Sequence, residues 1–269
     1  MELHRTLTYK GHRIHFREEG KEHAQTLVLL HGFLQNLDVW SSYTLTYMRS
    51  IHIVAIDLPG HGYSDVYDNV HTMDFMAEAV RAILNEIGVE QCVMVGHSMG
   101  GYVALAFAEH YPYLLRGLGL VNSHAFADTP EQIQSRETNL QTVRSNTPAF
   151  VIGYISELFA PTRRVALNQD IKDLQDTCLE TPQEGIVAAI QGMALRPSRI
   201  HVLQQLEVPT LYILGKEDTK LPLEYGMVVA MEAKHAEVLI LADVAHMALI
   251  EERDYVKLRL RNFVSTCYF

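Results

Sequence analysis

A serine stands in a short glycine-flanked segment that joins two different sequence patterns. Residues 96–100 read G-H-S-M-G, directly after the apolar run 92–95 and before a helical pattern. A G-x-S-x-G segment between a strand and a helix is typical of a nucleophile elbow, a sharp turn that exposes the serine hydroxyl. Glycine suits both ends because a side chain there would collide with the turn. The sequence therefore predicts that Ser98 is a catalytic nucleophile.

A serine hydroxyl is a weak nucleophile at neutral pH and needs a base beside it. The chain has 14 histidines, and position favours His246 among them. This residue follows the apolar run 238–241 and precedes the last helical pattern, which places it at the carboxyl edge of a parallel sheet. Ser98 is expected at the same edge, where ligands bind in open α/β sheets. We therefore predict that His246 is the general base.

The acid that orients the base is expected between the serine and the histidine in chain order. Asp218 fits, because it follows the apolar run 210–214 in the segment G-K-E-D. Glu217 and Asp243 are nearby alternatives. Asp243 lies only three residues before the histidine and is better suited to support its loop. Asp218 is therefore the predicted third member of a catalytic triad.

Attack on an acyl carbon produces an alkoxide that must be stabilised by two directed donors. One is predicted to be the backbone N–H of Met99, directly after the nucleophile. The other is predicted to be the backbone N–H of Phe33, in the H-G-F-L segment that follows the apolar run 26–30. Together these two groups would form an oxyanion hole.

The elements that must position these residues alternate along the chain. Short apolar runs are separated by patterns with helical spacing, which indicates a mostly parallel sheet with helices on both faces. Residues 3–9 and 13–18 are expected to form a hairpin. The apolar runs are residues 26–30, 52–56, 92–95, 118–121, 210–214 and 238–241.

Residues 123–199 break this alternation, because they contain helical patterns and no strand-like run. The segments T-P-E-Q at 129–132 and T-P-Q-E at 181–184 are typical helix starts. We expect an α/β core formed by residues 1–122 and 200–269 and a helical cap formed by residues 123–199. The substrate pocket is expected between them, and the side chains predicted to bind substrate are Phe33, Phe126, Phe150, Tyr154, Phe159 and Met247.

Composition excludes several other functions. The formal net charge of −10 over 269 residues argues against nucleic acid as a partner. No stretch approaches the roughly 18 apolar residues that span a membrane, and residues 1–20 show no secretory signal. Three well-separated cysteines, Cys92, Cys178 and Cys267, are typical of reduced thiols in a cytoplasmic protein rather than of a metal site. A monomer and a homodimer are equally compatible with the sequence.

Taken together, the motifs resemble the α/β-hydrolase superfamily, in its capped single-domain branch of serine hydrolases and esterases. The resemblance rests on residues 31–33, 57–65, 96–101, 215–218 and 245–247 and covers nearly the whole chain. It implies an eight-stranded sheet with a cap inserted after the sixth strand. It also implies that Ser64 and Asp65, in the D-x-P-G-H-G-x-S-D segment, shape a loop and are structural.

The expected activity is that of a cofactor-free serine hydrolase that cleaves an ester or related acyl bond of a small apolar substrate through an acyl-enzyme. Two alternatives remain open. The same fold also carries C–C bond hydrolases and lyases, in which the triad acts as a base without acylation. A small-molecule receptor built on a hydrolase scaffold is the other alternative, and the intact predicted triad argues against it.

Overall fold

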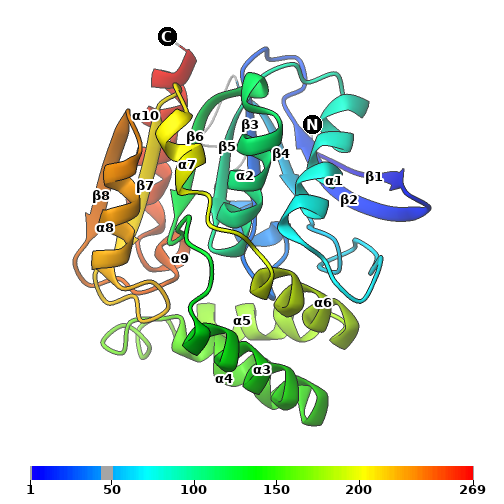
Figure 1. Ribbon diagram of the computed structural model, residues 1–269, viewed down its shortest axis with the longest axis vertical. Coiled ribbons are helices and arrows are strands. Elements are labelled where there is room, and N and C mark those ends of the chain that lie inside the picture. The colour runs from blue at the N-terminus through cyan, green and yellow to red at the C-terminus, as the bar shows by residue number, and fades with distance from the viewer. Residues whose placement is uncertain (1, 44–50, 269) are drawn as a thin grey trace.

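The computed structural model describes residues 2–43 and 51–268, and its centre is an eight-stranded sheet (Figure 1). The strand order is β1-β2-β4-β3-β5-β6-β7-β8. Among the described strands, β2 runs antiparallel to both of its neighbours, β1 and β4, and all other pairs are parallel. The strands are β1 (Glu2–Tyr9), β2 (His12–Glu19), β3 (Thr26–Leu30), β4 (His52–Ile56), β5 (Cys92–His97), β6 (Leu115–Val121), β7 (Thr210–Gly215) and β8 (Ala236–Leu241).

Helices cover both faces of the sheet, so the predicted fold class is confirmed. The helices are α1 (Met73–Glu86), α2 (Met99–His110), α3 (Pro130–Ser145), α4 (Thr147–Glu157), α5 (Asn168–Leu179), α6 (Gln183–Ala194), α7 (Ile200–Gln205), α8 (Leu223–Glu232), α9 (Ala248–Glu251) and α10 (Arg253–Tyr268), with short 3-10 segments η1 (Leu37–Tyr43) and η2 (Pro112–Leu114).

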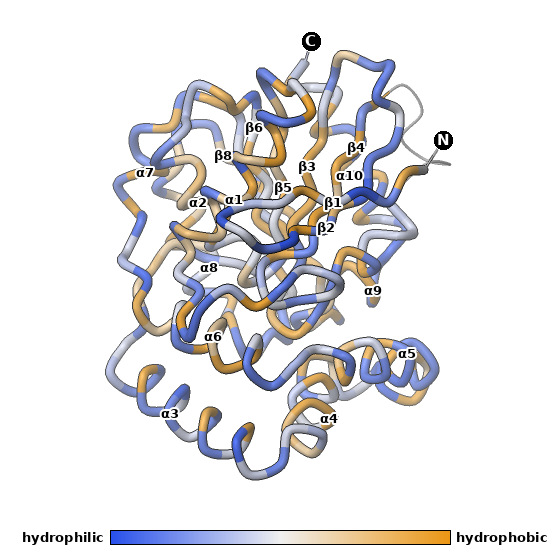
Figure 2. The backbone as a smooth tube through the Cα atoms, turned by 90° about the vertical axis from the view of Figure 1, so that its right-hand side faces the viewer, coloured by the Kyte–Doolittle hydropathy of each residue, from blue (hydrophilic) through white to orange (hydrophobic). Residues whose placement is uncertain are grey.

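The inner strands are apolar because both of their faces are covered. Every residue of β3, β4, β5 and β7 is buried. On one face the core includes Val80 of α1 and Val103 of α2, and on the other it includes Trp40 of η1 and Phe263 of α10. Figure 2 shows the apolar strands between these two layers. This arrangement gives the loops at the carboxyl edge a rigid base.

Helices α3 to α6 lie together at one end of the molecule, beyond the layers that cover the sheet (Figures 1 and 2). Helix α3 lies against α6, and α4 lies against α5. These helices occupy the stretch in which the sequence showed no strand-like run. None of the described helices has both the length and the apolar content needed to cross a bilayer.

Candidate active site

The turn at Ser98 is tight, and its two glycines explain why. Ser98 has a φ of 51°, in the left-handed region that non-glycine residues rarely adopt. A Cβ atom on Gly96 would lie 2.2 Å from the carbonyl oxygen of Gly100. A Cβ atom on Gly100 would lie 2.4 Å from the carbonyl oxygen of Leu30, at the end of β3. The chain can therefore pass from β5 into α2 and hold this strained serine only with glycine at both positions.

Three side chains that are remote in sequence meet at this turn. The Oγ atom of Ser98 lies 2.8 Å from Nε2 of His246, and Nδ1 of the same imidazole lies 2.8 Å from Oδ2 of Asp218. Ser98 follows β5, Asp218 follows β7 and His246 follows β8, so three loops at one edge of the sheet bring the groups together. This is the geometry in which a histidine can take a serine proton while a carboxylate fixes its tautomer.

Asp218 is buried and fully hydrogen-bonded. Its Oδ2 also accepts from the side-chain amide of Asn122 at 3.0 Å, and its Oδ1 accepts from the backbone N–H groups of Lys220 and Leu221 at 2.9 Å. Burial raises the pKa of Asp218, but the charge of the facing His246 and these hydrogen bonds outweigh it and hold the pKa below its ordinary value. The carboxylate is therefore ionised at neutral pH.

The loop that carries His246 is held by groups that the sequence did not reveal. Oε1 of Glu251 accepts from the backbone N–H groups of Ala245 and Met247, at 2.9 and 3.2 Å. The backbone N–H of His246 donates to the carbonyl of Leu158 at 2.9 Å. Nε2 of the buried His97 lies 2.9 Å from the carbonyl oxygen of His246. Hydrogen bonds to the backbone of residues 245, 246 and 247 thus hold the loop that carries the imidazole.

The two predicted oxyanion donors are backbone N–H groups without a hydrogen-bond partner among the described residues. Among the described residues, no group accepts a hydrogen bond from the backbone N–H of Phe33 or of Met99. Met99 is the first residue of α2, where the helix leaves its N–H groups free. The side chain of Gln35 accepts from the N–H of Gly32 at 3.0 Å and so orders the loop that carries Phe33. The structure therefore leaves both predicted oxyanion donors available.

A cavity of about 150 Å³ opens beside Ser98 and His246. Of the side chains predicted to bind substrate, Phe33 and Tyr154 line it, and the other four lie elsewhere. Phe150, Phe159 and Met247 are buried in the core, and Phe126 packs edge-on against Tyr225. These four side chains do not line the cavity because they pack against other side chains of the protein.

The lining of this cavity is mainly polar, unlike the apolar lining expected from the sequence. Polar and charged side chains from α3 and from the loops that follow β6, α6 and β7 contribute most of it. Those beyond the triad are Asn122, His124, Asp128, Gln132, Ser135, Arg136, Asn139, Arg196 and Lys220.

The segment 57–65 is held in place by hydrogen bonds and ion pairs of its own side chains. The hydroxyl of Ser64 donates to the backbone carbonyl of Asp57 at 2.6 Å, and the carboxylate of Asp65 pairs with Arg13. Asp57 accepts from the N–H groups of Leu37 and Tyr63 and lies 2.6 Å from Nδ1 of His15. Ser64 and Asp65 therefore make structural contacts, as the resemblance implied.

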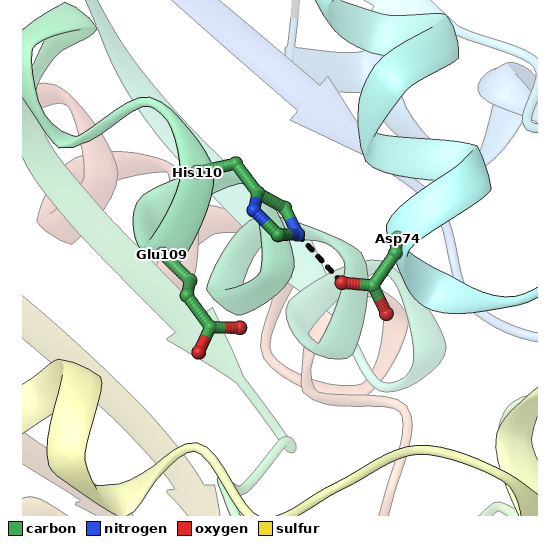
Figure 3. Close-up of side chains that lie close together, drawn as sticks. All are labelled: Asp74, Glu109 and His110. Carbon is green, nitrogen blue, oxygen red and sulfur yellow. Dashed lines mark hydrogen bonds and ion pairs between the residues drawn. The ribbon is translucent and has the colours of Figure 1, made fainter.

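Among the described residues, Asp74, Glu109 and His110 are close enough to share a metal ion (Figure 3). Arg199 already pairs with both carboxylates of this group. A divalent cation would have to displace that buried guanidinium. We therefore interpret the group as an ion-pair cluster that attaches residue 199 to α1 and α2.

The fold and the geometry of the site define a class of protein. The family model described as the alpha/beta hydrolase fold matches residues 25–253, and this chain belongs to that family.

Individual relatives have several activities. The dihydrolipoyllysine-residue acetyltransferase component of an acetoin cleaving system from Pseudomonas putida is 28% identical over 94% of this chain and 67% of its own length. The 2-hydroxy-6-oxononadienedioate/2-hydroxy-6-oxononatrienedioate hydrolase of Paraburkholderia phymatum is 25% identical over 94% of this chain and 91% of its own. A thermophilic esterase from Thermogutta terrifontis, solved with malate bound, superimposes with a TM-score of 0.91 at 28% identity, covering all of both chains. The fold and the similarity to the Paraburkholderia and Thermogutta proteins support a hydrolase.

Proposed function

We propose that this protein is a serine hydrolase that cleaves a carboxylic ester, with Ser98, His246 and Asp218 as its catalytic triad. The observation that carries the proposal is the chain of two 2.8 Å contacts from Ser98 through His246 to Asp218. It is supported by the strained φ of Ser98 and by the 28% identity to the Thermogutta esterase.

The reaction would proceed in two steps. Nε2 of His246 takes the proton from Ser98 as Oγ bonds to the ester carbon, and the N–H groups of Phe33 and Met99 stabilise the oxyanion. The bond to the alcohol then breaks as His246 protonates the leaving oxygen. Water, activated by the same imidazole, attacks the acyl-enzyme, releases the acid and restores the serine. Asp218 stabilises the imidazolium in both steps.

Residues 123–199 would serve as a cap on this site, with residues 1–122 and 200–269 as the core. Support comes from the cavity, whose lining includes Arg136 of α3, Tyr154 of α4 and Met193 of α6 beside Ser98 of the core. The hydroxyl of Thr181 also donates to the carbonyl of Leu34, which fixes this segment to the loop that carries Phe33.

The test compares Ser98→Ala with wild type on p-nitrophenyl acetate and adds labelling by a fluorophosphonate. We expect Ser98→Ala to retain its circular dichroism spectrum and to lose turnover by a factor of about 10⁴ or more. The fluorophosphonate should modify the peptide that contains Ser98, and Ser145→Ala, at an exposed serine of α3, should behave as wild type. A Ser98→Ala protein with unchanged turnover would refute the assignment.

A second candidate is hydrolysis of a carbon–carbon bond, favoured by the similarity to the Paraburkholderia hydrolase. In that case the triad would act as a base, and Ser98 would form no acyl-enzyme. Turnover of a vinylogous diketone without labelling of Ser98 would favour this candidate over ester hydrolysis.

A further inference from the structure

The cavity beside Ser98 carries more positive than negative charge on its walls. Its lining includes Arg136, Arg196 and Lys220, and Asp128 is the only carboxylate among the described residues that line it. The protein as a whole has a formal net charge of −10, so an excess of cations in this cavity is a local feature. A neutral ester as substrate would give these cations no partner.

The acceptor capacity of Asp128 is already committed to the two arginines. Its Oδ1 lies 2.7 Å from Nη2 of Arg196 and 3.3 Å from Nη2 of Arg136, and its Oδ2 accepts from Nε of Arg136. Burial raises the pKa of Asp128, but the two guanidinium groups outweigh this and lower it below its ordinary value. Two guanidinium groups therefore share one carboxylate, and one positive charge remains.

The two other nearby acids, Glu157 and Asp218, do not balance the positive charge that remains on the arginines. Glu157 pairs with Lys220 at 2.8 Å, but it is 63% exposed and does not line the cavity. Asp218 lies behind His246, and its oxygens already accept four hydrogen bonds. Neither carboxylate faces the two arginines from within the cavity.

The guanidinium of Arg196 has an unused donor. Its side chain is 2% exposed and lies over the ring of Tyr102 at 4.0 Å, while Nη1 donates to the carbonyl of Met193. Within residues 2–43 and 51–268, Nε has no hydrogen-bond partner. Among the described residues, Nη1 of Arg136 contacts only the sulfur of Met193, a weak acceptor. Nε of Arg196 is too deeply buried for a ligand to reach, whereas the side chain of Arg136 is 18% exposed and lines the cavity. A ligand can therefore reach the guanidinium of Arg136.

The positive field also acts on a neighbouring histidine. His124 lines the cavity and lies 3.0 Å from the hydroxyl of Tyr102. Burial, followed by the charge of Arg196, lowers the pKa of His124 to about 3. His124 is therefore neutral at pH 7 and adds no further positive charge.

We propose that Arg136, backed by the positive charge of the buried Arg196, binds a free carboxylate of the substrate, which is thus a short ester that also carries a carboxylate group. Guanidinium groups form strong hydrogen bonds with carboxylates, and a ligand oxygen would give Nη1 of Arg136 an acceptor. The cavity volume of about 150 Å³ favours a short acid. The ester part of this inference rests on the proposed function, whereas the carboxylate part does not.

The experiment measures kcat/KM for two charged esters and their neutral counterparts of equal length. Monoethyl glutarate is compared with ethyl pentanoate, which places the carboxylate on the acyl side. 4-Acetoxybutanoate is compared with butyl acetate, which places it on the alcohol side. We expect at least one charged ester to exceed its neutral counterpart by a factor of ten or more. If neither does, the carboxylate inference is overturned while ester hydrolysis stands.

The variant Arg136→Gln should reduce this preference at least tenfold. Arg144→Gln removes an exposed arginine from the same helix and should leave the preference unchanged. An independent measurement needs no variant: glutarate should compete with p-nitrophenyl acetate in the wild type, and the neutral glutaramide should not. Equal inhibition by the two compounds would contradict the inference.

Ester hydrolysis and the carboxylate site can be refuted independently of each other. If no ester is hydrolysed, the proposed function is wrong, and calorimetry with glutarate then decides the carboxylate site alone. Binding that Arg136→Gln weakens at least tenfold, and Arg144→Gln does not, would support the site. Binding that is absent in the wild type would overturn it.

Discussion

Oε1 of Glu251 lies 2.9 Å from the backbone nitrogen of Ala245 and accepts its hydrogen bond. The same atom accepts from Met247, and the other oxygen accepts from Ala160 at 2.9 Å. Burial raises the pKa of Glu251 despite these hydrogen bonds. One buried carboxyl group thus ties together both residues beside His246 and a residue of the segment 123–199.

Removing this group should displace His246 without touching substrate. We expect Glu251→Ala to lower kcat by a factor of about 10 to 100, because a misplacement of the base of about 1 Å has that effect, while KM changes little. Steady-state kinetics on p-nitrophenyl acetate give both constants. Glu224→Gln, at an exposed carboxylate of α8, is the control and should match wild type. A variant of Glu251 that raises KM alone would contradict a positioning role.

The proposed orienting acid, Asp218, can be tested against its two sequence alternatives, Glu217 and Asp243. Asp218→Asn should lower kcat by about 10⁴-fold, because an amide can favour the wrong imidazole tautomer and cannot stabilise the imidazolium. Glu217→Gln and Asp243→Asn should change kcat little, since both side chains are exposed. A larger loss in either control than in Asp218→Asn would reassign the acid.

The tight turn at Ser98 should not tolerate a methyl group. In Gly100→Ala the new Cβ would lie 2.4 and 2.6 Å from the carbonyl oxygens of Leu30 and His31. The end of β3 would have to move, and we expect a loss of unfolding free energy of about 3 kcal/mol together with loss of activity. Chemical denaturation measures the first and ester turnover the second.

Gly153 provides the matched control for that substitution. It lies in α4, and a Cβ there would meet nothing within 4 Å. Gly153→Ala should therefore be neutral or stabilise the protein by about 0.5 to 1 kcal/mol. Equal destabilisation by the two alanines would show that close contact at the turn is not the cause.

Acid sensitivity should follow from the buried carboxylate of Asp57. Burial raises its pKa, but the hydrogen bond from His15 and the backbone donors outweigh this and lower the pKa below its ordinary value. The ionised group therefore stabilises the fold above about pH 4, and this contribution is lost as pH falls through the folded-state pKa. We expect Asp57→Asn to cost about 3 kcal/mol at neutral pH.

The measurement is denaturant unfolding of wild type and Asp57→Asn between pH 7 and pH 3. The difference in unfolding free energy should shrink at the acid end. Asp243→Asn, at an exposed loop aspartate, should give no difference at any pH. A gap between wild type and Asp57→Asn that stays constant down to pH 3 would contradict the argument.

The sequence predicted what depends on local patterns and on chain order. The parallel sheet followed from apolar runs, and the structure confirms it. Thr129 forms the predicted capping box with Gln132. The similar T-P-Q-E segment misled, because Thr181 makes no cap and its hydroxyl bonds to Leu34 instead. The last helical pattern, which follows His246, is in fact two helices, α9 and α10.

Long-range contacts were beyond the reach of sequence patterns. Glu251 and Leu158 hold the His246 loop, but nothing in their own surroundings along the chain indicates it. Asn122 lies directly after β6, and no pattern around it along the chain indicates that its amide donates to Asp218. Arg136 and Arg196 are 60 positions apart and meet only because α3 and the end of α6 converge on Asp128.

The hydrogen bond from His246 to Leu158 has a consequence for redesign of this enzyme. Leu158 belongs to the segment 123–199, so that segment supports the imidazole through its backbone as well as shaping the cavity. Grafting these helices from a relative would change selectivity and turnover together. A designer who wants to vary one without the other would have to retain residues 158–160 and exchange only the side chains that face the cavity.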